Sequence, residues 1–302
     1  LKRDPGFATI AITVLAVGIG ANLAMFSILD AVLLKPLPYA KPDRIVRVWE
    51  APRPGSTNST STPDYLDWKR LGTCFNALVA EVPLSMALSG AGEAARLSGK
   101  AVTSDYFRVF DTDPLIGRTF TAQDDQRGAD SVVVLSHATW QTHFGADPRI
   151  LERRTLLDGE SHAIIGVLRP GALDSERSEF WKALVFTPDQ YLRGSHWLRV
   201  HGRLRDGVSP ALAQEQMRSI QASLVEVTPL YKRSWQVMVE PLQSLMVGRR
   251  LRQSILVASG AVLLVLLIAC ANVANLLIAK GAARTKEISI RAALGASRGR
   301  LM

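Results

Sequence analysis

Gly99 and Lys100 form the part of the sequence that comes closest to a phosphate-binding loop. Such a loop has four residues between its two glycines, and its Lys is followed by a Ser or Thr that holds magnesium. Here six residues separate Gly92 from Gly99, and Ala101 stands where the hydroxyl is needed. We therefore predict that this chain binds no nucleotide or other cofactor of its own.

The histidines are the next residues that could do chemistry, as metal ligands or general bases. His137 and His143 are six residues apart, whereas two ligands on one helical face are four apart. No nucleophile with an elbow or an adjacent base is recognisable. The sequence therefore predicts a non-catalytic chain without a metal site. The remaining histidines are His162, His196 and His201.

The positive charge of the chain is concentrated at its end. The net charge is +9, and the last 23 residues carry six basic groups and one acid. Residues 35–252 carry 28 basic and 24 acidic groups, a surface of mixed sign that does not suit nucleic acid. Anionic lipid headgroups explain the basic end better. Cys74 and Cys270 do not form a disulfide framework, because Cys270 lies in an apolar stretch far from Cys74.

Two uncharged stretches are long enough to cross a membrane. Residues 253–279 are 27 uncharged residues, and residues 7–29 are 23. At about 1.5 Å per helical residue, each exceeds the roughly 30 Å of a hydrocarbon core. A cleavable signal peptide is the alternative for the first stretch. Its apolar core is too long for one, and no clear cleavage site follows it.

Small residues on one helical face favour close helix packing in these stretches. Ala16, Gly20 and Ala24 are spaced four residues apart and therefore share one face. Asparagines in a span could line a transport path, but hydrogen bonding between helices is the simpler role, which we favour. These asparagines are Asn22, Asn272 and Asn275.

Basic residues beside both stretches predict the topology. Lys2 and Arg3 precede the first stretch, and short basic segments beside a span tend to stay in the cytoplasm. Basic residues also flank the long loop, but long translocated loops are largely exempt from this rule. We expect a cytoplasmic flank at 1–6, transmembrane helices at 7–34 and 253–279, an extracytoplasmic domain at 35–252 and a cytoplasmic segment at 280–302.

The long loop combines short strands with short helices. Alternation or apolar runs predict strands at IVRVWE, FNALVAEV, SVVVLS and WQVMVEPL. We expect helices at DYLDWKRL, VTSDYFRVF, HATWQTHF and after Ser209, which is placed to cap a helix with Pro210 in its first turn. Leu157-Asp158-Gly159-Glu160 predicts a hairpin turn. The loop is therefore expected to be an α+β domain in two lobes.

Five segments of the sequence match a known pattern. They are PGFATIAITVLAVGIGANLAMFSILDAVLLKPLPY, VTSDYFRVFDTDPLIGRTF, LSHATWQTHFGADPRIL, LDGESHAIIGVLRP and LLVLLIACANVANLLIAKGAARTKEISIRAALGASRGRL. Through them the chain resembles MacB/FtsX-like ABC transporter permeases, most closely the duplicated orphan permeases of acidobacterial type. The resemblance implies membrane α-helices flanking a MacB-like periplasmic core domain. It also implies a fragment that holds two of four spans and the start of an FtsX-like permease domain.

The resemblance also implies that the segment after the second span contacts a separate ATPase. Local signals agree, because Thr285 can cap a short helix, Glu287 suits its first turn and Gly295 can end it. A basic tail that binds only lipid is the alternative. The coupling segment is expected to use Thr285, Glu287, Ile288, Ile290, Arg291, Leu294, Gly295 and Ser297.

These features together suggest a permease subunit of a bacterial inner (plasma) membrane. It would couple ATP hydrolysis by an ABC ATPase subunit, which binds the ATP, to a conformational change of its extracytoplasmic domain for export or mechanotransmission. Membrane lipids, a second permease unit and periplasmic proteins are further expected partners. The alternative is a membrane-tethered sensor or binding protein without an ATPase, which would not need residues 285–297.

Overall fold

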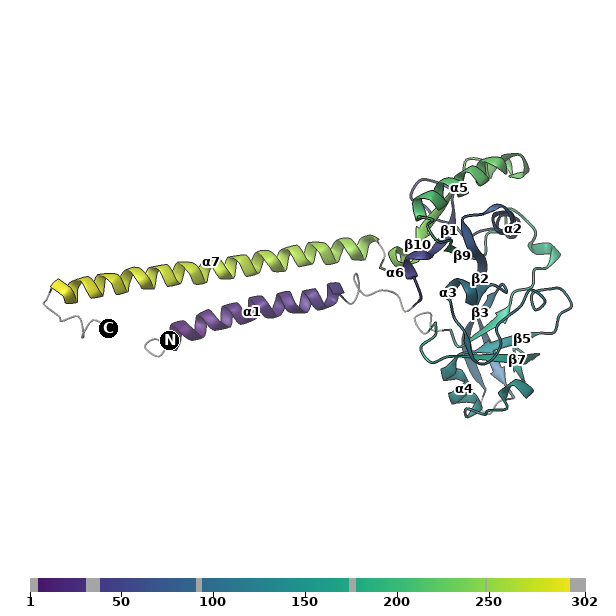
Figure 1. Ribbon diagram of the computed structural model, residues 1–302, viewed down its shortest axis with the longest axis horizontal. Coiled ribbons are helices and arrows are strands. Elements are labelled where there is room, and N and C mark those ends of the chain that lie inside the picture. Colours follow the sequence, from purple (N-terminus) through teal and green to yellow (C-terminus); the bar gives the residue numbers. More distant parts are fainter. Residues whose placement is uncertain (1–4, 31–38, 91–93, 174–177, 248, 294–302) are drawn as a thin grey trace. The chain divides into compact units, whose positions relative to one another are not determined.

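In the computed structural model, the described residues are 5–30, 39–90, 94–173, 178–247 and 249–293. The chain forms two compact units (Figure 1). One unit contains residues 1–35 and 247–302, and the other extends from Pro36 to Met246. Each unit is considered by itself below.

The unit from Pro36 to Met246 is built around one mixed sheet. Its order is β10-β1-β9-β2-β3-β8-β5-β7-β4, with β6 paired to β2 and β7. The β3–β8 and β5–β7 pairs are parallel, and the other pairs are antiparallel. The strands are β1 (Ile45–Ala51), β2 (Phe75–Ser89), β3 (Ala95–Val102), β4 (Pro114–Gly117), β5 (Val132–Leu135), β6 (Arg154–Leu157), β7 (Glu160–Leu168), β8 (Phe180–Ala183), β9 (Arg199–Leu204) and β10 (Gln236–Pro241).

Short helices connect the strands. Serine side chains cap three of them: the hydroxyl oxygens of Ser61, Ser136 and Ser209 each accept a hydrogen bond from the backbone N–H three residues further along the chain. The cap predicted at Ser209 is thereby confirmed. The helices are α2 (Thr62–Leu71), α3 (Tyr106–Phe110), α4 (His137–Phe144), α5 (Pro210–Ser223) and α6 (Leu242–Val247), and 3-10 turns lie at Pro42–Arg44, Ile150–Glu152, Pro188–Gln190, Val225–Val227 and Leu230–Lys232.

The predicted hairpin turn between β6 and β7 is also confirmed. Asp158 and Gly159 both have positive φ, 50° and 81°, which is the backbone of a tight type I′ turn. The carboxylate of Asp158 accepts a hydrogen bond of 2.7 Å from the N–H of Ala87. The turn residue therefore also fixes the hairpin against β2.

Three clusters of buried apolar side chains form the described core of this unit. The first packs α2 and α5 on the sheet and includes Trp68 and Met217. The second surrounds α3 and includes Phe110, and the third lies beside α4 and includes Phe144. Figure 1 shows α2 and α5 toward one end of the sheet and α4 toward the other. One sheet connects these ends, and the predicted division into two lobes stays a prediction.

A glutamine covers the end strand β10. The side-chain nitrogen of Gln214, on α5, donates to the carbonyl of Val237 at 2.8 Å. Its side-chain oxygen accepts from the N–H of Val239, also at 2.8 Å. A side-chain amide therefore binds two backbone groups of an end strand in the way that a neighbouring strand would.

The other unit contains two long helices, α1 (Pro5–Leu29) and α7 (Arg249–Ala293). Within the described residues, the run Gln253–Ala279 of α7 is long and apolar enough to cross a bilayer, judged by its length and composition. The apolar run identified in α1, Ala16–Leu29, is shorter than that length. The first predicted span, 7–34, therefore stays a prediction, as do the predicted domain boundaries.

Candidate functional site

Helices α1 and α7 contact each other along the face of α1 that contains Gly18 and Asn22. The side-chain nitrogen of Asn22 donates to the carbonyl of Gly18 at 2.9 Å and to that of Val262 at 3.2 Å. A Cβ added at Gly18 would lie 3.0 Å from a terminal carbon of Leu266. Asn22 thus forms the type of interhelical hydrogen bond that the sequence predicted for the asparagines.

The predicted packing residues lie elsewhere on the two helices. Ala16, Gly20 and Ala24 are exposed in this unit, and a Cβ at Gly20 would meet nothing within 4 Å. Asn272 and Asn275 are exposed as well. The face of α7 that is at least partly buried repeats every three or four residues, at Ile255, Ser259, Val262, Leu266, Ala269 and Val273. Packing of the exposed small residues against further helices stays a prediction.

The predicted coupling segment lies at the end of α7. The helix runs without interruption from Arg249 to Ala293, so Thr285 lies inside it and does not cap a new helix. This corrects the prediction, and the reason is that no proline separates the span from the helix-forming residues after it. One continuous helix therefore contains the apolar run together with Thr285, Glu287, Ile288, Ile290 and Arg291. Leu294, Gly295 and Ser297 lie outside the described residues.

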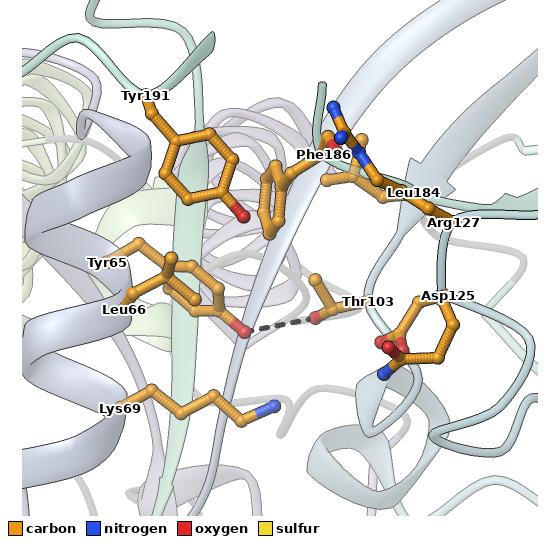
Figure 2. A pocket seen from close by; sticks show the side chains of 10 residues that line it. Tyr65, Leu66, Lys69, Thr103, Asp125, Arg127, Leu184, Phe186 and Tyr191 are labelled. Atoms are coloured by element: carbon orange, nitrogen blue, oxygen red, sulfur yellow. Dashed lines mark hydrogen bonds between the residues drawn. The ribbon is translucent and has the colours of Figure 1, made fainter. Parts of the chain in front are cut away.

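The unit from Pro36 to Met246 contains a cavity of about 390 Å³ beside α2 (Figure 2). Helix α2 supplies Tyr65, Leu66 and Lys69, and Thr103 follows β3 directly. Two loops complete the lining, 125–127 before β5 and the segment after β8 that carries Leu184, Phe186 and Tyr191. These residues form no recognisable pattern in the sequence, because they come from four separate parts of the chain.

Three aromatic rings line this cavity. The ring centroids of Tyr65 and Phe186 are 6.1 Å apart, and those of Phe186 and Tyr191 are 6.4 Å apart. The hydroxyl of Tyr65 donates to the carbonyl of Leu78 and to the hydroxyl of Thr103, each at 3.3 Å. Burial raises the pKa of Tyr65. The rings therefore form an apolar wall with a neutral phenol fixed at one side (Figure 2).

Two cations and one acid complete the lining. Lys69 extends from α2 toward the cavity (Figure 2), and its ammonium lies 3.4 Å from the carboxylate of Asp105. Asp125 accepts a hydrogen bond of 3.1 Å from the N–H of Ser104. The Nε of Arg127 donates to the carbonyl of Phe186 at 3.2 Å. Among the described residues, no carboxylate lies within ion-pair distance of Arg127.

A buried charge network holds α2 and the segment with Tyr191 in place. Lys232 is fully buried, and its ammonium forms ion pairs with Glu50, at 2.7 Å, and with Asp64. Arg193 contacts Asp64 at 2.6 Å and Asp67 at 2.5 Å. Because Asp64 and Asp67 belong to α2, the network fixes one wall of the cavity relative to the other.

A second cavity, of about 470 Å³, shares Leu184 with the first. The hydrogen bonds from the guanidinium of Arg118 hold the pKa of Asp124, on its lining, at about 2. His162 also lines it, and its Nδ1 lies 2.9 Å from the carbonyl of Glu160. Burial lowers the pKa of His162, so its ring is neutral at pH 7. The part of the chain that the structure describes contains no group of three metal-ligating side chains.

The Gly–Lys pair considered first in the sequence lies inside a strand. Lys100 is in β3, and its ammonium contacts the carboxylate of Glu81 at 2.7 Å and the hydroxyl of Tyr106 at 3.1 Å. His201 lies 3.4 Å from the other oxygen of the same carboxylate. Lys100 therefore belongs to a buried polar cluster of the sheet and not to a phosphate-binding loop.

Comparison with known proteins shows similarity to transport proteins. A family model described as the MacB-like periplasmic core domain matches residues 8–220. The "Probable syringafactin export ATP-binding/permease protein SyfD" of Pseudomonas syringae pv. tomato is 26% identical over 205 residues, 67% of this chain and 30% of that protein. The "Probable export ATP-binding/permease protein" of Pseudomonas fluorescens is 25% identical over 194 residues, 63% and 29%. The chain thus spans less than a third of the length of these relatives.

A solved structure shares the fold. It is the crystal structure of a domain of a protein described as a permease from Porphyromonas gingivalis. The TM-score is 0.52 at 13% sequence identity, over 68% of this chain and 93% of that domain. At this identity the similarity establishes the fold alone.

Proposed function

Because this chain belongs to the MacB-like periplasmic core domain family, we propose that it is a permease component of an ABC-type transporter. The observation that carries this proposal is the family match, which covers residues 8–220. The names of the two curated relatives, both export ATP-binding/permease proteins, support it. In this role the chain itself is not catalytic, and ATP is bound and hydrolysed by an ABC ATPase subunit.

The proposed topology places the apolar run of α7 across the inner membrane. Residues 280–302 are then cytoplasmic, and the unit from Pro36 to Met246 is extracytoplasmic. Two observations support this arrangement: the length of the apolar run Gln253–Ala279, and the six basic residues that follow it. The first span at 7–34 completes the arrangement.

The proposed mechanism uses α7 as a rod. This helix has 45 residues, so it is about 68 Å long and carries both the apolar run and most of the coupling segment. ATP-driven movement of the ATPase displaces the cytoplasmic end of α7, and the continuous helix carries the displacement through the membrane. The extracytoplasmic domain then changes position for export or mechanotransmission. A second permease unit and periplasmic proteins are further proposed partners.

Co-purification from native membranes tests this proposal. The tagged full-length protein is compared with a Glu287→Ala, Arg291→Ala double variant, and ATPase activity is measured in each preparation. The matched control is Glu215→Ala, Arg218→Ala, which removes an exposed acid–base pair from α5. We expect ATPase activity with the wild type and the control, and its loss with the double variant.

Two outcomes would contradict the proposal in different ways. If no ATPase accompanies any of the three proteins, the chain is a membrane-tethered sensor or binding protein. If the ATPase accompanies all three equally, the chain is a transporter component, but residues 285–297 do not form the coupling segment.

A further inference from the structure

We propose that the cavity beside α2 binds a small amphipathic anion, with an aromatic body and one carboxylate or phosphate group. This inference goes beyond the proposed transport function, because it assigns a ligand class to a site in the unit from Pro36 to Met246. It does not depend on an ATPase partner. This ligand class follows from the size of the cavity, from its aromatic wall and from the hydrogen bonding of Arg127.

The size of the cavity suits a small molecule. Ligand pockets in proteins measure about 300–1,000 Å³, and the volume here is about 390 Å³. Tyr191 and Arg127 are exposed at its edge, while Tyr65 is buried in its interior. The cavity therefore has an open side and a buried aromatic ring in its mixed polar and apolar lining, and it accommodates one ring system better than a long peptide.

The wall favours an aromatic or flat apolar body. Tyr65, Phe186 and Tyr191 form a continuous series of rings, and Leu66 and Leu184 add aliphatic surface. Trp197, which is not among the lining residues, packs edge-on against Phe186 with ring centroids 6.2 Å apart. These rings are held in place, so a flat ligand can stack without first ordering them.

The charges favour one negative group at the open side. Lys69 already has a carboxylate partner in Asp105, at 3.4 Å, and Asp125 is oriented by the N–H of Ser104. Arg127 differs, because within the described ranges its one hydrogen bond is from Nε to the carbonyl of Phe186. That bond holds the guanidinium next to the aromatic wall, as Figure 2 shows, and leaves the two terminal nitrogens to bind an anion in a bidentate manner.

Two matched fluorescent probes test the proposal. Dansylglycine carries an aromatic body and a carboxylate, and dansylamide carries the same body without the charge. All six tryptophans lie between Trp49 and Trp235, inside the unit from Pro36 to Met246. Energy transfer from tryptophan to the dansyl group therefore reports binding to this unit. The 302-residue chain is used in phosphatidylcholine nanodiscs, and empty nanodiscs give the background.

We expect the wild type to bind dansylglycine about tenfold more tightly than dansylamide, because a hydrogen bond to a charged group contributes roughly that factor. Arg127→Gln should abolish this difference and leave the affinity for dansylamide unchanged. Phe186→Ala should weaken both probes. Arg218→Gln, which removes an exposed arginine on α5, is the matched control and should change neither affinity.

Several results would overturn the proposal. They are the absence of saturable energy transfer with either probe, equal affinity of the wild type for both probes, and an unchanged affinity for dansylglycine in Arg127→Gln. An equal loss in Arg218→Gln would also overturn it, because the effect would then come from net charge. If a simple anion suffices for binding, inorganic phosphate displaces dansylglycine. If the aromatic body is required as well, phenyl phosphate displaces dansylglycine and inorganic phosphate does not. None of these measurements depends on the ATPase.

Discussion

Replacing Lys232 by Met removes the cation from the buried network that joins α2 to the segments around it. In the wild type the ammonium of Lys232 is fully buried and bound by Glu50 and Asp64. Methionine has a similar length and no charge, so the packing volume is kept. The substitution leaves two buried carboxylates close together, with Arg193 as the nearest full cation for Asp64.

The expected effect is large because the carboxylates left behind cannot reach water. Breaking a buried ion pair by removing one partner costs roughly 3–5 kcal/mol. For a domain of about 150–250 residues, each kcal/mol lowers the melting temperature by roughly 2–4 °C. The Lys232→Met variant should therefore melt roughly 6–20 °C below the wild type. Adding Glu50→Gln removes one of the two unpaired buried charges and should recover part of the lost melting temperature.

Acidification provides an independent check of the same reasoning. Burial alone raises the pKa of Asp64, but the charge and hydrogen bond of Lys232, together with hydrogen bonds that involve Ser61 and Glu50, outweigh burial and lower the pKa from its ordinary value of 3.8. A carboxylate with a depressed pKa stabilises the fold at neutral pH, and this stability is lost as the pH falls below about 4. The difference in melting temperature between the wild type and Lys232→Met should therefore become smaller as the pH approaches 4 and falls below it.

Thermal unfolding followed by tryptophan fluorescence measures this effect in the 302-residue chain, because all six of its tryptophans lie in the unit from Pro36 to Met246. The matched control is Lys41→Met. Lys41 is exposed and lies 3.8 Å from Asp206, so its loss should cost below about 1 kcal/mol, or below about 4 °C. Equal and small shifts in the melting temperature of both variants would refute the reasoning, since burial would then not determine how much stability the loss of a lysine charge removes.

Three further predictions concern other parts of the chain. Gly18→Ile should reduce cross-linking between cysteines placed at facing positions of α1 and α7, whereas Gly20→Ile, whose added Cβ meets nothing, should not. Asp124, whose pKa the guanidinium of Arg118 lowers to about 2, stabilises the fold above about pH 4; this stability should disappear between pH 4 and 2, and Arg118→Gln should remove that dependence in acid unfolding. In a variant without native cysteines, Ala211→Cys, at an exposed position on α5, should react with an impermeant maleimide in intact spheroplasts; reaction only after lysis would contradict the proposed topology.

The native Cys74 is unsuitable for that topology experiment. Its side chain is buried, and burial raises the pKa of its thiol to about 11. The thiolate that maleimides attack is therefore scarce at neutral pH, and access is blocked as well. Absence of labelling at Cys74 would consequently carry no information about the side of the membrane.

Features that depend on neighbouring residues could be predicted from the sequence. The cap at Ser209 and the turn at Asp158 and Gly159 are examples, because the hydrogen bonds and φ angles involved are set within a few residues. The cavity beside α2 could not be predicted in this way, because its lining residues are far apart in the sequence. Tyr65 and Phe186 are 121 positions apart, and long-range contacts such as the pairing of β3 with β8 and the ion pairs of Arg193 with α2 bring their segments together.

The helices show where a local pattern fails. Small residues occur on several faces of α1, so the spacing of Ala16 and Gly20 did not reveal that Gly18 faces α7. Similarly, Thr285 is a good cap residue, but a cap forms only where a helix begins. The helix before it does not end, because Gly281 alone costs only about 1 kcal/mol in a helix interior.

The amide of Gln214 has a consequence for how copies of this domain can meet. An end strand normally offers its free N–H and C=O groups to any other chain, and two sheets can then merge edge to edge. At β10 the carbonyl of Val237 and the N–H of Val239 are already bound. A second copy would have to break both hydrogen bonds before it could form its own. Two copies that met at this edge would therefore remain separate sheets, and side chains would make the contacts between them.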